Sequence, residues 1–188
     1  MSSHHIIREK QEPALYIHEL AAFNEEYLGQ LLEWSPTLIV NDTEYEKVIS
    51  MGLKVDAVVN SSGLTSFQEN TKVINVKIDP LDSVLDFLIA EQYQAVNVID
   101  TKSNLRELGS YIDEINIVVF TATEKAYAIK SGFKVWKPKG SIFKIEVVSY
   151  FETSNLMQVE ESGDFVVIND GFVEFIFTTP YLFISEVL

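Results

Sequence analysis

Short apolar runs alternate with helix-like stretches as far as about residue 120. Leu81, Val84, Leu85 and Leu88 recur at helical spacing and predict an amphipathic helix there. The repeated order of strand, helix and strand favours right-handed crossovers and a mostly parallel sheet. The runs typical of buried strands are Ala14–Ile17, Thr37–Asn41, Val55–Val59, Val73–Ile78, Ala95–Ile99 and Ile115–Phe120.

Capping residues mark where the helices between these strands begin and end. Asn24 precedes a helix expected to run through Trp34, and Asp79-Pro80 joins a capping carboxylate to a proline suited to the first helical position. Asp42 and Thr43 are expected to cap a helix over 44–51, which Gly52 closes. A shorter helix is expected near 104–111.

The pattern changes at the linker Trp136–Gly140, after which strand-like runs follow one another without a convincing helix. The turn motifs Ser162–Asp164 and Asn169–Gly171 predict hairpins. These patterns together predict an α/β fold: a mostly parallel, Rossmann-like αβα domain over 1–137, then a short antiparallel, sandwich-like β module over 138–188. The expected strands of that module are Ile142–Val148, Leu156–Glu160, Phe165–Ile168, Phe172–Phe177 and Leu182–Val187.

Composition excludes several classes of partner. The formal net charge of −14 argues against a nucleic-acid backbone or an anionic membrane, because both need clustered Lys and Arg. The chain has no cysteine, which fits a reducing cytoplasm. Its longest uncharged run, Phe175–Ser185, is well short of the roughly 20 residues that a spanning helix needs. We therefore expect a soluble, cytoplasmic protein.

The most informative polar segment is Asn60–Gly63, which follows the apolar run Val55–Val59. In open α/β sheets, ligands bind in the crevice outside the carboxyl ends of the strands. An enzyme acting on a polyphosphate needs carboxylates there to hold Mg²⁺. Asn60, Ser61, Ser62 and Gly63 provide an amide, two hydroxyls and a glycine instead.

Residues 34–63 resemble the first half of bacterial thiamine pyrophosphokinases. Asp42 stands at the first Asp of that family, Gly52–Asp56 resembles the segment before its second strand, and Asn60–Gly63 occupies the place of its Gly-Asp-Phe-Asp loop. The stretches 1–15 and 27–36 are also similar to one branch of the family, and its β-sandwich follows a linker similar to Trp136–Gly140. The resemblance implies a Mg²⁺- and ATP-dependent pyrophosphoryl transfer to thiamine by a homodimer.

The motifs that carry this activity are missing from the chain. The family's later Thr-Asp pair falls on Asp79-Pro80, so proline replaces a metal ligand. Its Arg-x-Asp-His segment has no counterpart between Ile99 and Asn116, nor has its Ser-Asn element between Val159 and Val173. Removing one preorganised electrostatic contact costs about 3–4 kcal/mol of transition-state stabilisation. We therefore expect a thiamine pyrophosphokinase-like protein without catalysis, and no cofactor.

A vestigial cleft with a binding or regulatory role toward a nucleotide or thiamine is the leading hypothesis. Two alternatives stay open: an active thiamine pyrophosphokinase that takes its carboxylates from Asp79, Asp82 or Asp100, with Mg²⁺ and ATP, and a structural dimerisation protein. Simpler roles compete at most positions, such as helix caps at Asp42 and Asp79, a turn at Asp56 and a polar tail at His4 and His5. No set of metal ligands surrounds His18 in the sequence. The cleft residues are Asp42, Asp56, Asn60, Ser61, Ser62, Gly63 and Asp79.

Overall fold

The structure is a computed structural model that describes residues 12–60, 62–146 and 150–188. Ser61 and the pair His4 and His5, which the sequence singled out, lie outside these residues. The chain forms two compact units. One contains the chain up to Lys102 together with Ser110–Ile117, and the other contains Ser103–Gly109 and Val118–Leu188.

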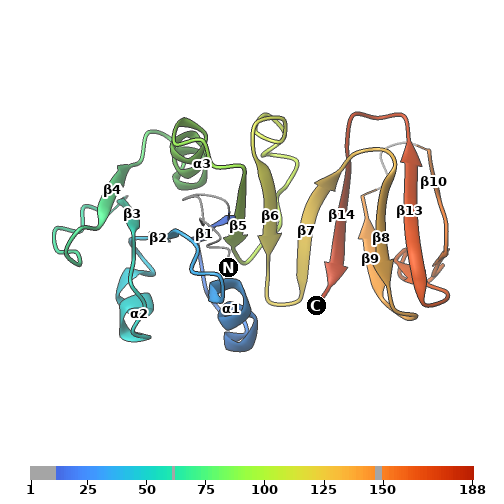
Figure 1. Cartoon of the computed structure of the whole chain (residues 1–188), viewed down its shortest axis with the longest axis horizontal. Helices are drawn as coiled ribbons and strands as arrows, with labels where there is room; N and C mark the ends of the chain where they lie inside the picture. The colour runs from blue at the N-terminus through green and yellow to red at the C-terminus, as the bar shows by residue number, and fades with distance from the viewer. Residues whose placement is uncertain (1–11, 61, 147–149) are drawn as a thin grey trace, which may run out of the picture. The chain divides into compact units, whose positions relative to one another are not determined.

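The first unit is built on parallel strands in the order β4-β3-β2-β1-β5 (Figure 1). The chain moves outward from β1 to β4 and then returns through α3 to β5 on the other side of β1. The order therefore reverses between β1 and β5. The elements are β1 (Ala14–Ile17), α1 (Glu25–Leu32), β2 (Leu38–Asn41), α2 (Tyr45–Ser50), β3 (Ala57–Asn60), β4 (Lys72–Asn75), α3 (Pro80–Ala90) and β5 (Ala95–Ile99).

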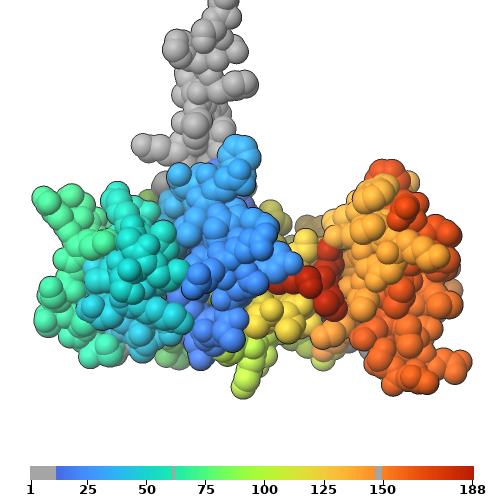
Figure 2. All heavy atoms as spheres, turned by 90° about the horizontal axis from the view of Figure 1, so that it is seen from below, coloured from blue at the N-terminus to red at the C-terminus, as the bar shows by residue number. Residues whose placement is uncertain are grey.

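Helices cover both sides of these strands. Figure 1 shows α1 and α2 on one side and α3 on the other, and α1 and α2 face the viewer in Figure 2. All of β1 is buried, from Ala14 to Ile17, and Val84, Leu85 and Leu88 of α3 are fully buried as well. A parallel strand buried on both faces is apolar throughout, which is why these runs were recognisable in the sequence. The predicted parallel pairing is confirmed for these five strands, which belong to a larger mixed sheet.

Most of the predicted helix caps are confirmed. Asn24 accepts hydrogen bonds from the N–H groups of Glu26 and Tyr27, and Asp79 accepts them from Leu81 and Asp82. Gly52 follows α2 with φ +78°, where glycine is favoured. The predicted cap of α2 is wrong.

The residue at the cap position of α2 is Glu44, which makes no side-chain capping bond. Asp42 instead reaches the loop after β3, as described below. The strand predicted at Val73–Ile78 ends at Asn75, and Ile78 is exposed just before the cap of α3. None of the helices in the described residues has the length and apolarity needed to cross a membrane.

The second unit is antiparallel. Val118–Phe120 of β6 (Asn116–Phe120) pairs with β7, and the order continues β7-β14-β9-β12-β11, while β10, β13 and β8 form a separate sheet. Phe143 and Phe175 are fully buried with ring centroids 5.7 Å apart. The remaining bounds are β7 (Glu124–Ile129), β8 (Phe133–Lys137), β9 (Ile142–Ile145), β10 (Phe151–Thr153), β11 (Leu156–Gln158), β12 (Phe165–Val167), β13 (Gly171–Phe177) and β14 (Leu182–Val187).

Two predictions about this unit are wrong. Asn169–Gly171 is not a hairpin turn, because β12 and β13 on either side of it belong to different sheets. Residues 104–111 form successive turns rather than a helix, with N–H groups bonded three residues back from Glu107 to Asn104 and from Leu108 to Leu105. Strands β7 and β8, which precede residue 138, are part of this unit as well.

Candidate functional site

Polar residues gather where the parallel strands of the first unit end. Asn60 is the last residue of β3, while His18, Asp42 and Asp100 come directly after β1, β2 and β5. Asp79 caps the helix that follows β4. Because parallel strands end at one edge of a sheet, these residues share that edge. The reversal of strand order between β1 and β5 makes it the expected place for a ligand.

Tyr16 lies at the centre of this edge. Its side chain is fully buried in β1, and its hydroxyl shares a 2.9 Å hydrogen bond with Nδ1 of His18. Burial raises the pKa of Tyr16 far above its ordinary value, and the negative charges of Asp79, Asp100 and Asp42 raise it further. Three carboxylates from three different connections therefore act on one hydroxyl, which stays protonated.

Asp42 fastens the loop after β3. Its side chain is 6% exposed, and Oδ2 accepts a hydrogen bond from the backbone N–H of Ser62 at 2.5 Å. Asn60 closes the same loop, because its Oδ1 accepts from the N–H groups of Gly63 at 2.9 Å and Leu64 at 3.0 Å. The backbone donors that could form an anion-binding nest are thus already bonded to side chains of the chain itself.

The cleft residues predicted from the sequence are only partly brought together. Asp42, Asn60, Ser62, Gly63 and Asp79 lie at the carboxyl edge. Asp56 does not, since it precedes β3 and accepts a hydrogen bond from the N–H of Leu38 at the start of β2. It also pairs with Lys54 at 3.3 Å. Asp56 therefore holds the amino ends of two strands.

Asn41 is a site residue that sequence reasoning missed. It is the last residue of β2, is 7% exposed, and its Oδ1 has no hydrogen-bond partner among the described residues. Asn41 lies two positions after Ile39, which pairs with Tyr16, so the two side chains share a face of the sheet. The available signal was an amide at the end of an apolar run.

Several carboxylates of this edge are held by local contacts. Within the described ranges, no group of three or more His, Cys, Asp or Glu side chains is arranged to hold a metal ion. Oδ1 of Asp100 accepts the N–H of Thr101 at 2.6 Å, and Asp79 is engaged as a helix cap. Burial and the nearby charges of Asp79 and Asp86 raise the pKa of Asp82. The edge therefore gathers carboxylates that already accept local hydrogen bonds.

Neither a family model nor a curated protein sequence matches this chain. Its fold nevertheless resembles solved thiamine pyrophosphokinases. The enzyme from Bacillus subtilis has a TM-score of 0.69 at 12% identity, over 93% of this chain and 98% of that one. The enzyme from Geobacillus thermodenitrificans has a TM-score of 0.67 at 12% identity, over 93% of this chain and 97% of that one. The yeast enzyme has a TM-score of 0.66 at 9% identity, over 97% of this chain and 88% of that one. The class that the structure defines is a thiamine pyrophosphokinase-like fold, as the sequence resemblance predicted.

Proposed function

We propose that this chain is a thiamine pyrophosphokinase-like protein that does not transfer pyrophosphate. In this proposal it binds a small organic cation, with thiamine as the first candidate, at the carboxyl edge of its parallel strands. The observation that carries the proposal is that Asp42 and Asn60 already occupy the N–H groups of the loop after β3. In a Rossmann-like nucleotide site such groups hold phosphate oxygens. A nucleotide would have to displace both side chains here.

The charges around Tyr16 favour a cation over a phosphate. Asp42, Asp79 and Asp100 all act on the Tyr16 hydroxyl, and Oδ1 of Asn41 adds a buried acceptor on the same face. A cationic ring is attracted by each of these groups, whereas every added phosphate is repelled by them. The formal charge of −14 extends the same preference over longer distances.

Calorimetric titration with thiamine, thiamine diphosphate and AMP in the absence of metal tests this proposal. We expect thiamine to bind, thiamine diphosphate to bind at least about tenfold more weakly, and AMP to give no heat. Asp79→Asn keeps a capping side chain but loses the charge, and together with Asp100→Asn it should abolish thiamine binding. Asp86→Asn, on the exposed side of α3, is the matched control. Tighter binding of AMP than of thiamine would overturn the proposal.

An active enzyme with a rewired metal site is the second candidate. The observation in its favour is that Asp79 and Asp100, two of the substitute ligands expected from the sequence, both act on Tyr16. Incubation with ATP, Mg²⁺ and thiamine decides between the two. Clear formation of thiamine diphosphate that Asp100→Asn abolishes would establish the enzyme.

We further propose a cytoplasmic homodimer, in keeping with a chain that has no cysteine. The surface that supports it is the outer face of the sheet β10-β13-β8. Trp136 and Phe172 lie directly opposite each other there and expose 54% and 57% of their surface. Aromatic side chains that are exposed in the isolated chain are typical of surfaces that become the centre of a protein–protein interface. A purely structural dimer would keep this face and bind no ligand at the carboxyl edge.

A further inference from the structure

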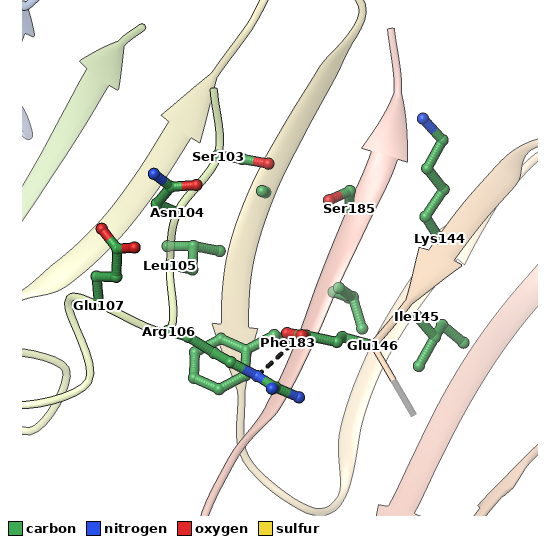
Figure 3. Close-up of a pocket in the computed structure, with 12 residues that line it drawn as sticks. Ser103, Asn104, Leu105, Arg106, Glu107, Lys144, Ile145, Glu146, Phe183 and Ser185 are labelled. Carbon is green, nitrogen blue, oxygen red and sulfur yellow. Dashed lines mark ion pairs between the residues drawn. The ribbon is translucent and has the colours of Figure 1, made fainter. Parts of the chain in front are cut away.

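The second unit contains a pocket of about 420 Å³, and none of the carboxyl-edge residues lines it. One wall is formed by residues 103–107 of the segment Ser103–Gly109, here called the strap, and the other walls come from β7, β9 and β14 (Figure 3). Leu105 and Leu108 of the strap are each 5% exposed, so they anchor it. The volume lies within the roughly 300–1,000 Å³ of small-molecule sites.

The floor of the pocket is hollow where two of its residues, Ser185 and Ala126, are small. Ser185 of β14 lies directly opposite both Ala126 of β7 and Lys144 of β9, so the three side chains form one row on the same face. The next residue of β14 on this face is Phe183, whose ring adds an apolar wall (Figure 3). A row of larger side chains would fill this space.

Polar contacts fasten the strap at both ends of the pocket. Oγ of Ser103 donates to Oε1 of Glu124 at 3.3 Å, and Nε of Arg106 pairs with Oε1 of Glu146 at 2.9 Å. The second contact is the dashed line in Figure 3. The strap therefore spans the hollow instead of filling it.

Both cations of the rim are already neutralised. Lys144 donates to Oε2 of Glu124 at 2.7 Å, and this hydrogen bond raises the pKa of the ammonium group. Arg106 is paired with Glu146, and Glu107 adds a further carboxylate to the lining. A phosphate would therefore meet more negative than positive charge, and an organic cation that used Glu124 or Glu146 would have to displace Lys144 or Arg106. An uncharged ligand would neither be repelled by the carboxylates nor have to displace these cations.

We propose that this pocket binds an uncharged nucleoside. The aromatic ring of Phe183 and the side chain of Leu105 provide apolar surfaces for a base. The hydroxyls of Ser103 and Ser185, which point toward each other across the space in Figure 3, provide partners for sugar hydroxyls. This inference concerns the second unit alone and does not rest on the cation site proposed for the first.

The test is a titration of the full chain with adenosine and with AMP, followed by heteronuclear NMR. We expect adenosine to shift the resonances of the strap and β14, and AMP to bind about tenfold more weakly because the carboxylate of Glu107 in the lining repels a phosphate. Ser185→Leu fills the hollow and should abolish the shifts. Ala128→Leu is the matched control, since Ala128 lies opposite Phe183 on the same face but outside the pocket.

A charge change gives a second and independent readout. Glu146→Gln removes the carboxylate that neutralises Arg106, so the preference for adenosine over AMP should fall about tenfold. Equal adenosine binding by wild type and Ser185→Leu would overturn the proposal, as would no binding at millimolar adenosine. If Ser185→Leu does not fold, the Glu146→Gln variant decides the question. An unchanged preference of that variant for adenosine over AMP would reject the site.

Discussion

The carboxylate of Asp42 accepts a hydrogen bond from the backbone N–H of Ser62, and thereby joins the connection after β2 to the loop after β3. The bond spans 20 positions of the sequence. The carboxylate of Asp42 therefore acts as a clamp, here meaning that it holds the loop after β3, instead of facing a ligand. The donor of this bond lies in Asn60–Gly63, which by the sequence resemblance stands in the place of the Gly-Asp-Phe-Asp loop of thiamine pyrophosphokinases.

Removing this clamp should destabilise the first unit. Asp42→Ala leaves the N–H of Ser62 without its charged acceptor, and hydrogen bonds to charged groups contribute about 1.5–3 kcal/mol. We expect a loss of about 2 kcal/mol in the free energy of unfolding, measured by urea denaturation. Asp42→Asn keeps an acceptor oxygen and should lose less. An Asp42→Ala protein as stable as wild type would show that the bond is dispensable.

Restoring the missing carboxylates should restore metal binding. The triple variant Ser61→Asp, Gly63→Asp and Pro80→Asp adds acids at the positions where the sequence resemblance places the family's ligands. We expect measurable Mg²⁺ binding by calorimetry where wild type shows none, because Mg²⁺ prefers carboxylate oxygens. Gly63 has φ +81°, which Asp tolerates at some cost, so the variant should also unfold at a lower temperature. Unchanged Mg²⁺ binding would show that the register is wrong.

A buried acid–base cluster should dominate the acid stability of the second unit. Glu186 is 6% exposed, pairs with Lys125 at 3.5 Å, and accepts hydrogen bonds from Lys137 and Tyr127. Burial alone would raise its pKa, but these contacts outweigh burial and hold the pKa below its ordinary value of 4.5. Glu186→Gln leaves Lys125 and Lys137, which are both half-buried, without their charged partner and should lower the free energy of unfolding by about 3 kcal/mol.

The sign of the pH dependence follows from that lowered pKa. A carboxyl group with a depressed folded-state pKa contributes stability above pH 4.5 and loses it as the pH falls through the folded-state value. The gap in unfolding free energy between wild type and Glu186→Gln should therefore narrow below pH 4.5. Urea denaturation at pH 7 and pH 3.5 measures it. A gap that stays constant would place the stabilisation elsewhere.

The exposed aromatic pair should decide the oligomeric state. Nζ of Lys134 lies 5.1 Å from the ring centroid of Phe172, so the face combines aromatic and cationic groups. Phe172→Glu with Trp136→Glu should convert a dimer to a monomer in light scattering. Met157→Glu, an equally exposed apolar residue on β11, is the control and should leave the dimer intact. A wild-type monomer would reject the dimer itself.

Strands with a continuous apolar run or a regular apolar alternation could be predicted closely from the sequence. Ala14–Ile17, Ala95–Ile99 and Leu182–Val187 were predicted with the bounds that the structure shows. Strands β7 and β8 were missed although Phe133 and Val135 alternate with Lys134 and Trp136. The alternation of apolar and polar residues in β8 is hard to recognise because Trp136 is exposed, whereas a tryptophan in a strand is normally expected in the core.

The candidate site could be predicted in its place but not in its contacts. The sequence located Asp42, Asn60 and Asp79 at strand ends, where ligands bind in such sheets. It assigned Asp42 to a helix cap because capping is a local preference, whereas the bond to Ser62 depends on the pairing of β2 and β3. The predicted helix near 104–111 failed for a related reason. Asn104 and Gly109 have low helical propensity, so little favours a helix there. The successive turns instead bury Leu105 and Leu108 in the second unit.

The path of the chain between its two units limits how the molecule can be divided. It passes from one unit to the other after Lys102, returns after Gly109, and leaves again after Ile117. No single truncation point yields either unit complete. A fragment that stops at Ile117 would carry Leu105 and Leu108 without the rest of the unit to which they belong, and one that starts at Val118 would lack the strap. We therefore expect the two halves to fold when they are produced together as complementary fragments, and not when each is expressed alone.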